Sequence, residues 1–337
     1  MSKGLKTKKW IVGITDYIRP PADIERQAFP EAKFVFLCDW RDSESNARHW
    51  RQVDALLAWH FPINRGTIEL LEQCKIVVRY GVGYDTVDVT ALAERDIPLC
   101  NTPDYGTEEV ADTACAMILA IQRKVWEYDC ACRCYRKDSW QENLLKPHQR
   151  TREQTLGIIG VGRIGTAVVN RMKPFRFRII GYDPYQPRGH EKAVGYERVD
   201  SQDKLLRQSD IVTLHCPLTD ETRGMVNAAF FKKMKKGASL VNTARGAILA
   251  GLDDLEEVLR CGRLSCAAMD VLPFEPPKDH PLLRAWRNDE RWLRGRLTIN
   301  PHAAYYSERG WYEMRYKAAE TARLYLLRGK LRNLIRP

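Results

Sequence analysis

The sequence predicts an α/β protein built on parallel sheets, and three observations carry this prediction. Short apolar segments alternate with helical patterns along both halves of the chain. In the second half these segments are nearly continuously apolar, as expected of strands that are covered by helices on both faces. A glycine-rich turn joins one such segment to a helical pattern. With 337 residues, the chain is long enough for two domains.

The individual elements follow from these patterns. In the first half we expect strands at 10–15, 33–37, 52–59 and 76–79, and a helical stretch at 68–73. One long helix should run from Thr107 to about Arg136, with Glu108 and Glu109 at the positive end of its dipole. A polar, irregular stretch follows at 137–154. The second half has expected strands at 156–160, 178–183, 210–216, 238–244, 265–270 and 297–304, a charged loop at 278–296 and a closing helix at 307–328.

Composition excludes several classes of protein. Hydrophobic residues make up 44% and charged residues 29%, the balance of a soluble globular chain rather than a disordered one. The longest apolar run, about Ala114 to Ile121, is too short for a membrane span of about 20 residues. We also see no secretory signal. These observations predict a cytoplasmic protein without a membrane partner.

The charge and the cysteines suggest no special ligand. The net charge is +11, but lysines and arginines are spread along the chain, and no zinc-finger or RNA-binding signature is present. We therefore expect no nucleic-acid partner. The ten cysteines are typical of small buried residues in a reducing compartment. Cys130, Cys132 and Cys134 lie in a helical pattern, where positions i, i+2 and i+4 do not converge, so we expect no metal site.

A phosphate-binding turn is predicted at Gly160-Val161-Gly162-Arg163-Ile164-Gly165. An apolar strand precedes this turn and a helical pattern follows it. Gly160 would allow the tight turn, Gly162 would let the backbone approach a pyrophosphate, and Gly165 would let helix and strand pack closely. The start of the helix would then offer free N–H groups to the phosphates.

An acidic residue at the end of the next strand completes the pattern. Asp183 follows Gly165 by 18 positions, close to the spacing of about 20 that is typical of dinucleotide-binding folds. Its carboxylate would accept hydrogen bonds from ribose hydroxyls and repel a 2′-phosphate. The sequence thus favours NAD over NADP, although the nearby Arg188 is a cation that keeps NADP open.

Three candidate catalytic residues lie at or after the ends of successive predicted strands. Ligands of open α/β sheets bind at the carboxyl ends of the strands, so Arg245, Glu275 and His302 could meet there. The guanidinium of Arg245 suits a carboxylate or a keto oxygen. His302 can exchange a proton near neutral pH, and Glu275 could orient its imidazole. Each residue taken alone has an ordinary structural explanation; their shared placement is what favours chemistry.

With these residues assembled, the chain resembles the D-isomer-specific 2-hydroxyacid dehydrogenase family, and within it the C-terminal-binding protein branch. The resemblance rests on motifs in the order of the family: "VVRYGVGYDTVD", "EEVADTACAMIL", "TLGIIGVGRIGTAV", "YDPY", "VTLHCPL", "LVNTARG", "AAMDV" with "EP", and "NPHAAYYSE" followed by "EMR". It is strongest from about Ile76 to Arg328.

The resemblance implies two Rossmann-like domains with parallel sheets. A flavodoxin-like substrate domain would comprise 1–106 and 305–337, and an NAD-binding Rossmann domain at 107–304 would be inserted into it. Homodimers would form through the cofactor domains. Arg245 would bind substrate, His302 would donate the proton, and Glu275 would be its paired acid.

Further roles are implied by position in the motifs. Cofactor contacts would come from Gly160, Gly162, Arg163, Ile164, Gly165, Asp183, His215, Cys216, Pro217, Thr222, Thr243, Ala244, Asp270 and His302. Substrate contacts would come from Arg79, Gly81, Val82, Gly83, Arg245 and Tyr305. Tyr305 stands where the C-terminal-binding protein branch has tryptophan, so the resemblance does not fix the shape of the substrate pocket. Ala250 and Gly251 replace the acidic pair that usually follows "TARG".

The expected function is hydride transfer between NADH and the 2-carbon of a small 2-oxo or 2-hydroxy acid, with NADP the less favoured cofactor. Glyoxylate, hydroxypyruvate, a phosphorylated hydroxy acid and a bulkier aryl or thioether 2-oxo acid all stay open as substrates. The alternative is an NADH-sensing binding protein, similar to the corepressors of the C-terminal-binding protein branch, with little turnover.

Overall fold

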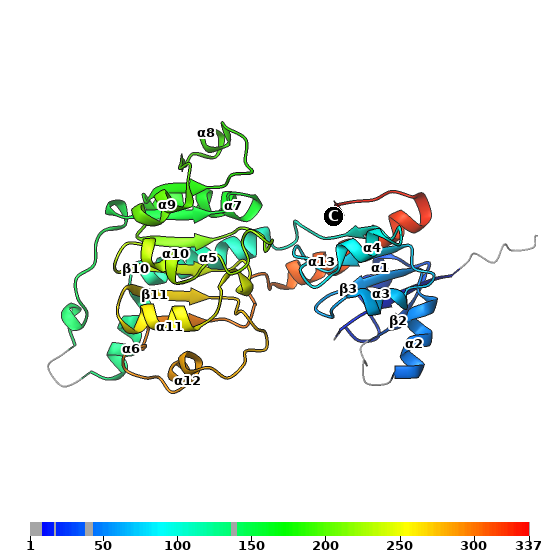
Figure 1. The fold of residues 1–337 in the computed structure, drawn as a ribbon, viewed down its shortest axis with the longest axis horizontal. Coiled ribbons are helices and arrows are strands. Elements are labelled where there is room, and N and C mark those ends of the chain that lie inside the picture. The colour runs from blue at the N-terminus through cyan, green and yellow to red at the C-terminus, as the bar shows by residue number, and fades with distance from the viewer. Residues whose placement is uncertain (1–8, 17, 38–42, 136–139, 337) are drawn as a thin grey trace, which may run out of the picture. The chain divides into compact units, whose positions relative to one another are not determined.

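The computed structural model describes residues 9–16, 18–37, 43–135 and 140–336 (Figure 1). The chain divides into two compact units. Unit 1 comprises residues 1–106 and 306–337, and unit 2 comprises residues 107–305. Each unit is an α/β structure with its own largely parallel sheet, which confirms the predicted fold class. In the part of the chain that the structure describes, no helix is both long and apolar enough to cross a bilayer.

Unit 1 is built on a six-stranded sheet in the order β13-β5-β4-β3-β1-β2. Its strands are β1 (Trp10–Ile14), β2 (Ala32–Phe36), β3 (Ala55–Ala58), β4 (Ile76–Arg79), β5 (Leu99–Cys100) and β13 (Leu334–Ile335). All pairs are parallel except β13 with β5. The last strand of the chain thus completes the sheet of the first unit.

Helices cover both faces of this sheet. They are α1 (Asp23–Ala28), α2 (Ser43–Gln52), α3 (Arg65–Glu69), α4 (Val89–Ala93) and α13 (Glu308–Arg328). Trp50 of α2, Ile68 of α3 and Leu92 of α4 join one buried cluster with the strands. The long α13 packs beside α1 and against β3 and β4. Ser307 caps α13 by accepting a hydrogen bond from the Gly310 amide at 2.8 Å.

Unit 2 contains a seven-stranded, wholly parallel sheet in the order β12-β11-β10-β9-β6-β7-β8. Its strands are β6 (Thr155–Ile159), β7 (Arg178–Tyr182), β8 (Glu197–Arg198), β9 (Ile211–Leu214), β10 (Ala238–Asn242), β11 (Leu264–Met269) and β12 (Leu297–Ile299). The central strands β6, β9 and β10 are buried at every position, as their continuous apolar sequences predict.

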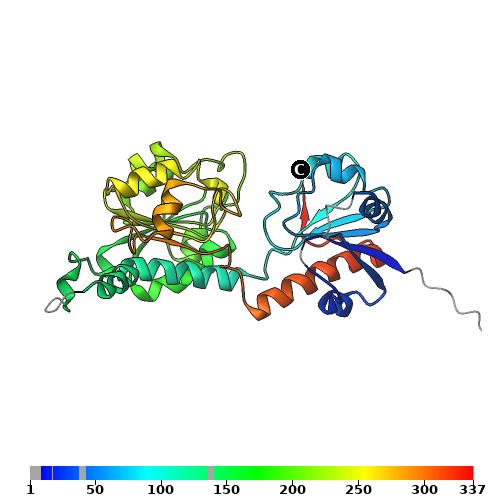
Figure 2. The same ribbon diagram turned by 90° about the horizontal axis from the view of Figure 1, so that it is seen from below.

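Two layers of helices enclose this second sheet. Its helices are α5 (Thr107–Gln122), α6 (Val125–Arg133), α7 (Arg163–Met172), α8 (His190–Val194), α9 (Gln202–Gln208), α10 (Ala228–Lys233), α11 (Asp253–Arg260) and α12 (Pro281–Arg287). Side chains of α5, α7 and α8 form one core, and those of α9 to α12 form the other. In Figure 2 the teal α5 lies below the strands and the yellow α11 lies above them.

The structure corrects several expected boundaries. The single helix expected from Thr107 to Arg136 is two helices, because Lys124 adopts a left-handed backbone with φ of 53°. The charged segment 278–296 contains a helix, α12, rather than only a loop. The strand expected at 297–304 ends at Ile299, which leaves His302 in the following loop. In unit 1, Gln52 ends a helix, so the strand expected at 52–59 is shorter.

Candidate active site

The glycine turn lies between β6 and α7, where backbone crowding demands glycine at two of its positions. Gly160 has a φ of 87°, and a β-carbon there would come within 2.5 Å of the Cys216 amide nitrogen. A β-carbon at Gly165 would lie 2.1 Å from the carbonyl oxygen of Gly160, so α7 packs directly on the turn. At Gly162, by contrast, no described residue other than its chain neighbours has an atom within 4 Å of an ideal β-carbon. The turn is therefore closed on its inner side and open at Gly162.

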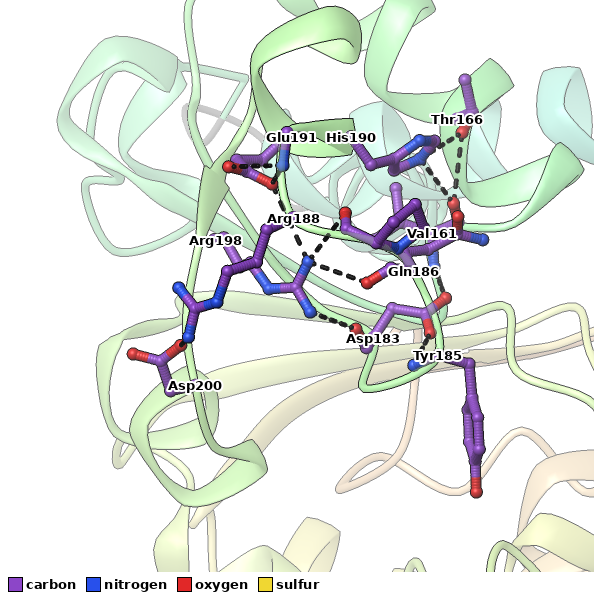
Figure 3. A network of polar contacts seen from close by, with 12 residues as sticks. Val161, Thr166, Asp183, Tyr185, Gln186, Arg188, His190, Glu191, Arg198 and Asp200 are labelled. Atoms are coloured by element: carbon purple, nitrogen blue, oxygen red, sulfur yellow. Dashed lines mark hydrogen bonds and ion pairs between the residues drawn. The ribbon is translucent and has the colours of Figure 1, made fainter.

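The carboxylate of Asp183, just past β7, braces this turn (Figure 3). One oxygen accepts the Val161 N–H at 2.8 Å, and the other accepts the Tyr185 N–H at 3.0 Å. Arg188 extends from the same loop to Asp200 at 3.9 Å, and both side chains are highly exposed. Asp183 therefore lies against the glycine turn, as the spacing predicts, while Arg188 forms a separate surface ion pair.

The remaining predicted contacts of the glycine turn differ in their surroundings. Arg163 is exposed at the start of α7, and Ile164 behind it is half-buried. The loop after β9 brings His215 and Cys216 against Gly160. Burial lowers the pKa of His215 to about 3 and raises the pKa of the Cys216 thiol to about 11, so both are neutral at physiological pH.

Thr222 is engaged locally rather than at the glycine turn. Its hydroxyl donates to the carbonyl of Pro217 at 2.7 Å and accepts the Thr219 N–H at 2.8 Å. The side chain thus closes the short exposed loop that follows Pro217. Any contact of the Thr222 hydroxyl with a cofactor would have to be made in addition to these two hydrogen bonds, or in place of one of them.

The turn after β10 presents Thr243, Ala244 and Arg245, and a buried asparagine holds it. The Asn242 side chain accepts the Ala244 N–H and donates to the Arg245 carbonyl, both at 3.0 Å. The Arg245 guanidinium in turn donates to the Ala244 carbonyl at 2.8 Å. The next residue, Gly246, packs so tightly that a β-carbon would fall 1.8 Å from the Leu272 carbonyl oxygen. This close approach places the Arg245 turn against the loop that carries Glu275.

Glu275 and His302 form a hydrogen-bonded pair, as the sequence analysis expects. Nδ1 of His302 lies 2.7 Å from Oε2 of Glu275, and the other carboxylate oxygen accepts the Leu272 N–H at 2.8 Å. Burial alone would raise the pKa of Glu275. The hydrogen bond and charge of His302, the Leu272 amide and the charge of Arg245 outweigh burial and lower that pKa. An ionised Glu275 fixes the imidazole with Nε2 directed away from the carboxylate.

The buried carboxylate of Asp270 holds the loop of His302. His302 has a φ of 55°, uncommon for a residue with a side chain, and its N–H donates to the Asp270 carbonyl at 2.7 Å. The Asp270 side chain accepts the N–H groups of Ala303 and Ala304 at 2.9–3.1 Å. Burial raises the pKa of Asp270 despite these amides. Tyr305 packs edge-on against the imidazole with ring centres 6.3 Å apart.

Unit 1 holds the remaining predicted residues on the turn that follows β4. Gly81 has a φ of 115°, and an ideal β-carbon there would lie 2.9 Å from the guanidinium of Arg79. The Gly81 N–H donates to the hydroxyl of Thr102 at 2.7 Å, and Asn101 donates to the Val82 carbonyl at 2.7 Å. The Gly81 amide is thus already occupied. Among the described residues, the amides of Val82 and Gly83 have no acceptor.

Sequence reasoning missed Asn242, Asn101 and Thr102, which hold two of these turns. Each follows or ends a buried strand, and each side chain bonds to backbone that the local sequence does not reveal. The only available signal was their position beside a predicted turn.

Comparison with known proteins identifies the family. Residues 115–304, more than half of the chain, match the profile described as "D-isomer specific 2-hydroxyacid dehydrogenase, NAD binding domain". The chain belongs to this family. The predicted resemblance is thereby confirmed, and the matched region contains the glycine turn, Asp183, Arg245, Glu275 and His302.

Individual relatives agree with this assignment. The chain is 40% identical over 223 residues to D-3-phosphoglycerate dehydrogenase of Methanocaldococcus jannaschii, covering 66% of this chain and 41% of that protein. It is 32% identical over 309 residues to C-terminal-binding protein 1 of Caenorhabditis elegans, covering 89% and 41%. The chain therefore spans about two fifths of the length of these curated relatives. The fold matches a D-lactate dehydrogenase of Aquifex aeolicus with a TM-score of 0.81, at 23% identity and coverage of 94% and 95%.

The residues of unit 2 fit the cofactor of this family. The hydroxyl of Thr243 and Nδ1 of His215 are buried without a hydrogen-bond partner among the described residues. They lie just after the ends of β10 and β9; β9 is the neighbour of β6, and β10 is the next strand beyond β9. Buried polar atoms without partners are costly, so a polar ligand at these strand ends would satisfy them. The open side of Gly162 and the start of α7 suit a pyrophosphate.

Proposed function

We propose that this protein is an NAD-dependent D-2-hydroxyacid dehydrogenase that interconverts a small 2-oxo acid and its 2-hydroxy acid. The observation that carries the proposal is the His302–Glu275 hydrogen bond of 2.7 Å, beside the Arg245 turn in the NAD-binding domain of this family. Reduction of a keto group requires a proton donor and a positive charge near the keto oxygen, and an acid–base pair next to a permanent cation supplies both.

The chemistry divides between cofactor and protein. Bound NADH supplies the hydride for the keto carbon. Nε2 of His302 gives the proton to the keto oxygen during reduction and takes it back during oxidation. Glu275 holds the imidazole in orientation and stabilises its charged form, and Arg245 faces the negative charge that develops on the oxygen.

The roles of the other predicted residues follow the same assignment. Gly160, Gly162, Arg163, Ile164, Gly165, Asp183, His215, Cys216, Pro217, Thr222, Thr243, Ala244 and Asp270 are assigned to the cofactor side. The amides of Val82 and Gly83, with Arg79 beside Gly81, are assigned to the substrate carboxylate, and Tyr305 to the substrate pocket. Because the Gly81 amide bonds to Thr102, we assign Gly81 to the shape of the turn.

The domain roles and the setting belong to the same proposal. We assign cofactor binding to 107–304 and substrate binding to 1–106 with 305–337. We expect a homodimer through the cofactor domains, NAD preferred over NADP, and a cytoplasmic location, which the nine described cysteines, all free thiols, support.

The test is oxidation of NADH with a panel of 2-oxo acids: glyoxylate, hydroxypyruvate, a phosphorylated substrate and bulkier aryl and thioether compounds. His302→Gln should lower kcat by roughly 100-fold or more, the usual contribution of general acid–base catalysis. His49→Gln, a change at an exposed histidine of α2, is the matched control and should leave turnover unchanged.

Two results would contradict the proposal. Full turnover by His302→Gln would remove His302 from the reaction. Tight NADH binding by the wild-type protein without turnover on any member of the panel would favour the alternative, an NADH-sensing binding protein.

A further inference from the structure

His190, which begins the short helix α8, contacts the glycine turn at the carbonyl of Val161 (Figure 3). Its Nε2 lies 3.0 Å from the carbonyl oxygen of Val161 and 3.4 Å from the hydroxyl oxygen of Thr166. A carbonyl oxygen can only accept, so Nε2 must carry the proton and donate it. The direction of the hydrogen bond is therefore fixed: His190 donates to the backbone of the turn.

The backbone at Val161 is held from two sides. The Val161 N–H donates to Asp183 at 2.8 Å, while the Val161 carbonyl accepts from His190 and from the hydroxyl of Thr166 at 3.3 Å. Asp183 follows β7 and His190 begins α8, so one short segment of the chain bonds to both the N–H and the C=O of Val161. Hydrogen bonds on both sides of Val161 restrict rotation of the Val161–Gly162 peptide.

The orientation of the Val161–Gly162 peptide decides where the Gly162 N–H points. In a trans peptide the C=O and the N–H point in opposite directions. A carbonyl anchored towards His190 therefore turns the Gly162 N–H to the opposite side. Leaving aside its chain neighbours, no described residue has an atom within 4 Å of an ideal β-carbon at Gly162, so the turn is uncrowded at this residue.

We propose that His190 is a positioning residue for the pyrophosphate of NAD(H), acting through the Val161–Gly162 peptide. The inference rests on NAD binding as part of the proposed function, but not on the identity of the substrate. His190 touches neither the cofactor nor the reacting atoms in this account. It sets the direction of a backbone donor before the dinucleotide arrives, which lowers the cost of ordering the turn on binding.

The segment that carries His190 is itself anchored. Arg198, at the end of β8, donates to the carbonyls of Asp183, Gln186 and Pro187 at 3.0–3.2 Å. The ring of Tyr196 packs edge-on against the imidazole with ring centres 6.0 Å apart. The imidazole is thus held in place within unit 2 by contacts that need no ligand.

The experiment measures dissociation constants rather than turnover. NADH and ADP-ribose both contain the pyrophosphate, whereas adenosine lacks it. In His190→Ala the Val161 carbonyl loses one of its two hydrogen bonds and keeps only the longer one from Thr166, so NADH and ADP-ribose should bind about five- to tenfold more weakly. Adenosine, measured by its competition with NADH, should bind as before. His190→Gln, which keeps a side-chain N–H donor, should recover part of the loss.

Lys192→Ala is the matched control, since Lys192 is an exposed cation on the same helix. This variant tests whether a positive charge on α8 is enough to favour binding of the pyrophosphate. We expect unchanged affinity for NADH, ADP-ribose and adenosine. Thermal unfolding of every variant reports on folding, so that a general loss of structure is recognised.

The inference is overturned by three outcomes. These are NADH affinity within about twofold of wild type in His190→Ala, an equal loss for adenosine and ADP-ribose, or a wild-type protein that does not bind NADH. A protein that binds NADH but reduces no 2-oxo acid would overturn the proposed reaction and leave the role of His190 intact.

Discussion

The turn after β4 in unit 1 and the turn after β6 in unit 2 begin alike and end differently. Each starts with a glycine of positive φ, Gly81 or Gly160, whose own N–H is used internally, by Thr102 in one case and by the Tyr182 carbonyl in the other. The turn of unit 2 then runs straight into α7, whereas the next helix of unit 1, α4, begins only at Val89.

This difference shows two ways to present backbone N–H groups to an anion. In unit 2 the helix start adds several amides and a dipole, which suits the double charge of a pyrophosphate. In unit 1 two amides and the neighbouring Arg79 suit a single carboxylate. Side chains of Asp183 and Thr102 brace the two turns, so each turn can be altered separately.

The largest effect should come from breaking the turn of unit 2 at its first glycine. In Gly160→Ala the new methyl group would meet backbone atoms of Cys216 at 2.5 Å, in a backbone conformation that disfavours side chains. We expect the free energy of unfolding to fall by about 2–4 kcal/mol and NADH affinity to fall by roughly 100-fold. Chemical denaturation and NADH titration measure the two effects.

Gly162→Ala is the control for that change. Its new methyl group would meet no described residue within 4 Å beyond its chain neighbours, so the free energy of unfolding should be kept while NADH binds more weakly. Loss of stability in Gly162→Ala equal to that in Gly160→Ala would contradict the description of the turn as open on one side.

A change that spares both turns separates binding from proton transfer. Glu275→Gln should lower kcat by about 10- to 100-fold, because the imidazole of His302 loses the carboxylate that orients it. Neither NADH affinity nor KM should change much. A kcat equal to that of the wild type would exclude the pairing of Glu275 with His302 as functional.

The same variant tests how the charge of Glu275 contributes to stability. The pKa of Glu275 is lowered in the folded state. The contribution of its charge to the free energy of unfolding is therefore complete at pH values above the ordinary pKa of glutamate, and it is lost as the pH falls through the lowered pKa of the folded state. The difference in free energy of unfolding between wild type and Glu275→Gln should therefore shrink in acid. A constant difference would contradict this.

Removing the carboxylate of Asp183, which accepts two backbone N–H groups at the unit 2 turn, should have an intermediate effect on cofactor affinity. Asp183→Ala deletes the acceptor of two backbone N–H groups and the charge that opposes a 2′-phosphate. We expect NADH to bind about tenfold more weakly and NADPH to bind no worse than before, so that the preference narrows. Dissociation constants for both cofactors provide the measurement; an unchanged ratio would exclude Asp183 as the discriminating residue.

Removing the hydroxyl of Thr102, which accepts the Gly81 N–H in the unit 1 turn, should have the smallest effect, and that effect should be on KM. Thr102→Val leaves the buried Gly81 N–H without an acceptor at nearly constant volume. We expect KM for the 2-oxo acid to rise about fivefold with NADH affinity unchanged. Thr102→Ser, which retains the hydroxyl, serves as the control. A rise in the NADH dissociation constant would show that the turns are not separable.

Much of the cofactor side could be predicted because its signals are local. The strand, the three glycines and the following helix are adjacent in sequence, and Asp183 ends the next strand. The pairing of Glu275 with His302 was also predicted, since both follow neighbouring strands of a parallel sheet.

The break after α5 could not be read from the sequence in the same way. No glycine or proline interrupts Gln122 to Val125, and the helical pattern continues across it. The start of α6 instead packs on a distant segment: a β-carbon at Gly295 would lie 2.6 Å from Cα of Glu127. Such a contact between residues far apart in the chain overrides local helix preference.

The helix α12 did carry a local signal. His280 caps it by accepting the Leu282 N–H, and Pro281 occupies its first position. The charged composition of 278–296 obscured this start, although Leu282, Leu283 and Ala285 form a buried face. Asn242 and Thr102 left no comparable sign, because their bonds depend on the folded turns.

The short strand β13 has a practical consequence for anyone who handles the protein. It pairs with β5, and Asn333, just before it, exchanges hydrogen bonds of 3.3 Å with Asn101, the neighbour of Thr102. A protease cut ahead of Leu334 would therefore release the strand edge that supports the Gly81 turn. Assays of substrate affinity should use material whose final residues are verified by mass spectrometry.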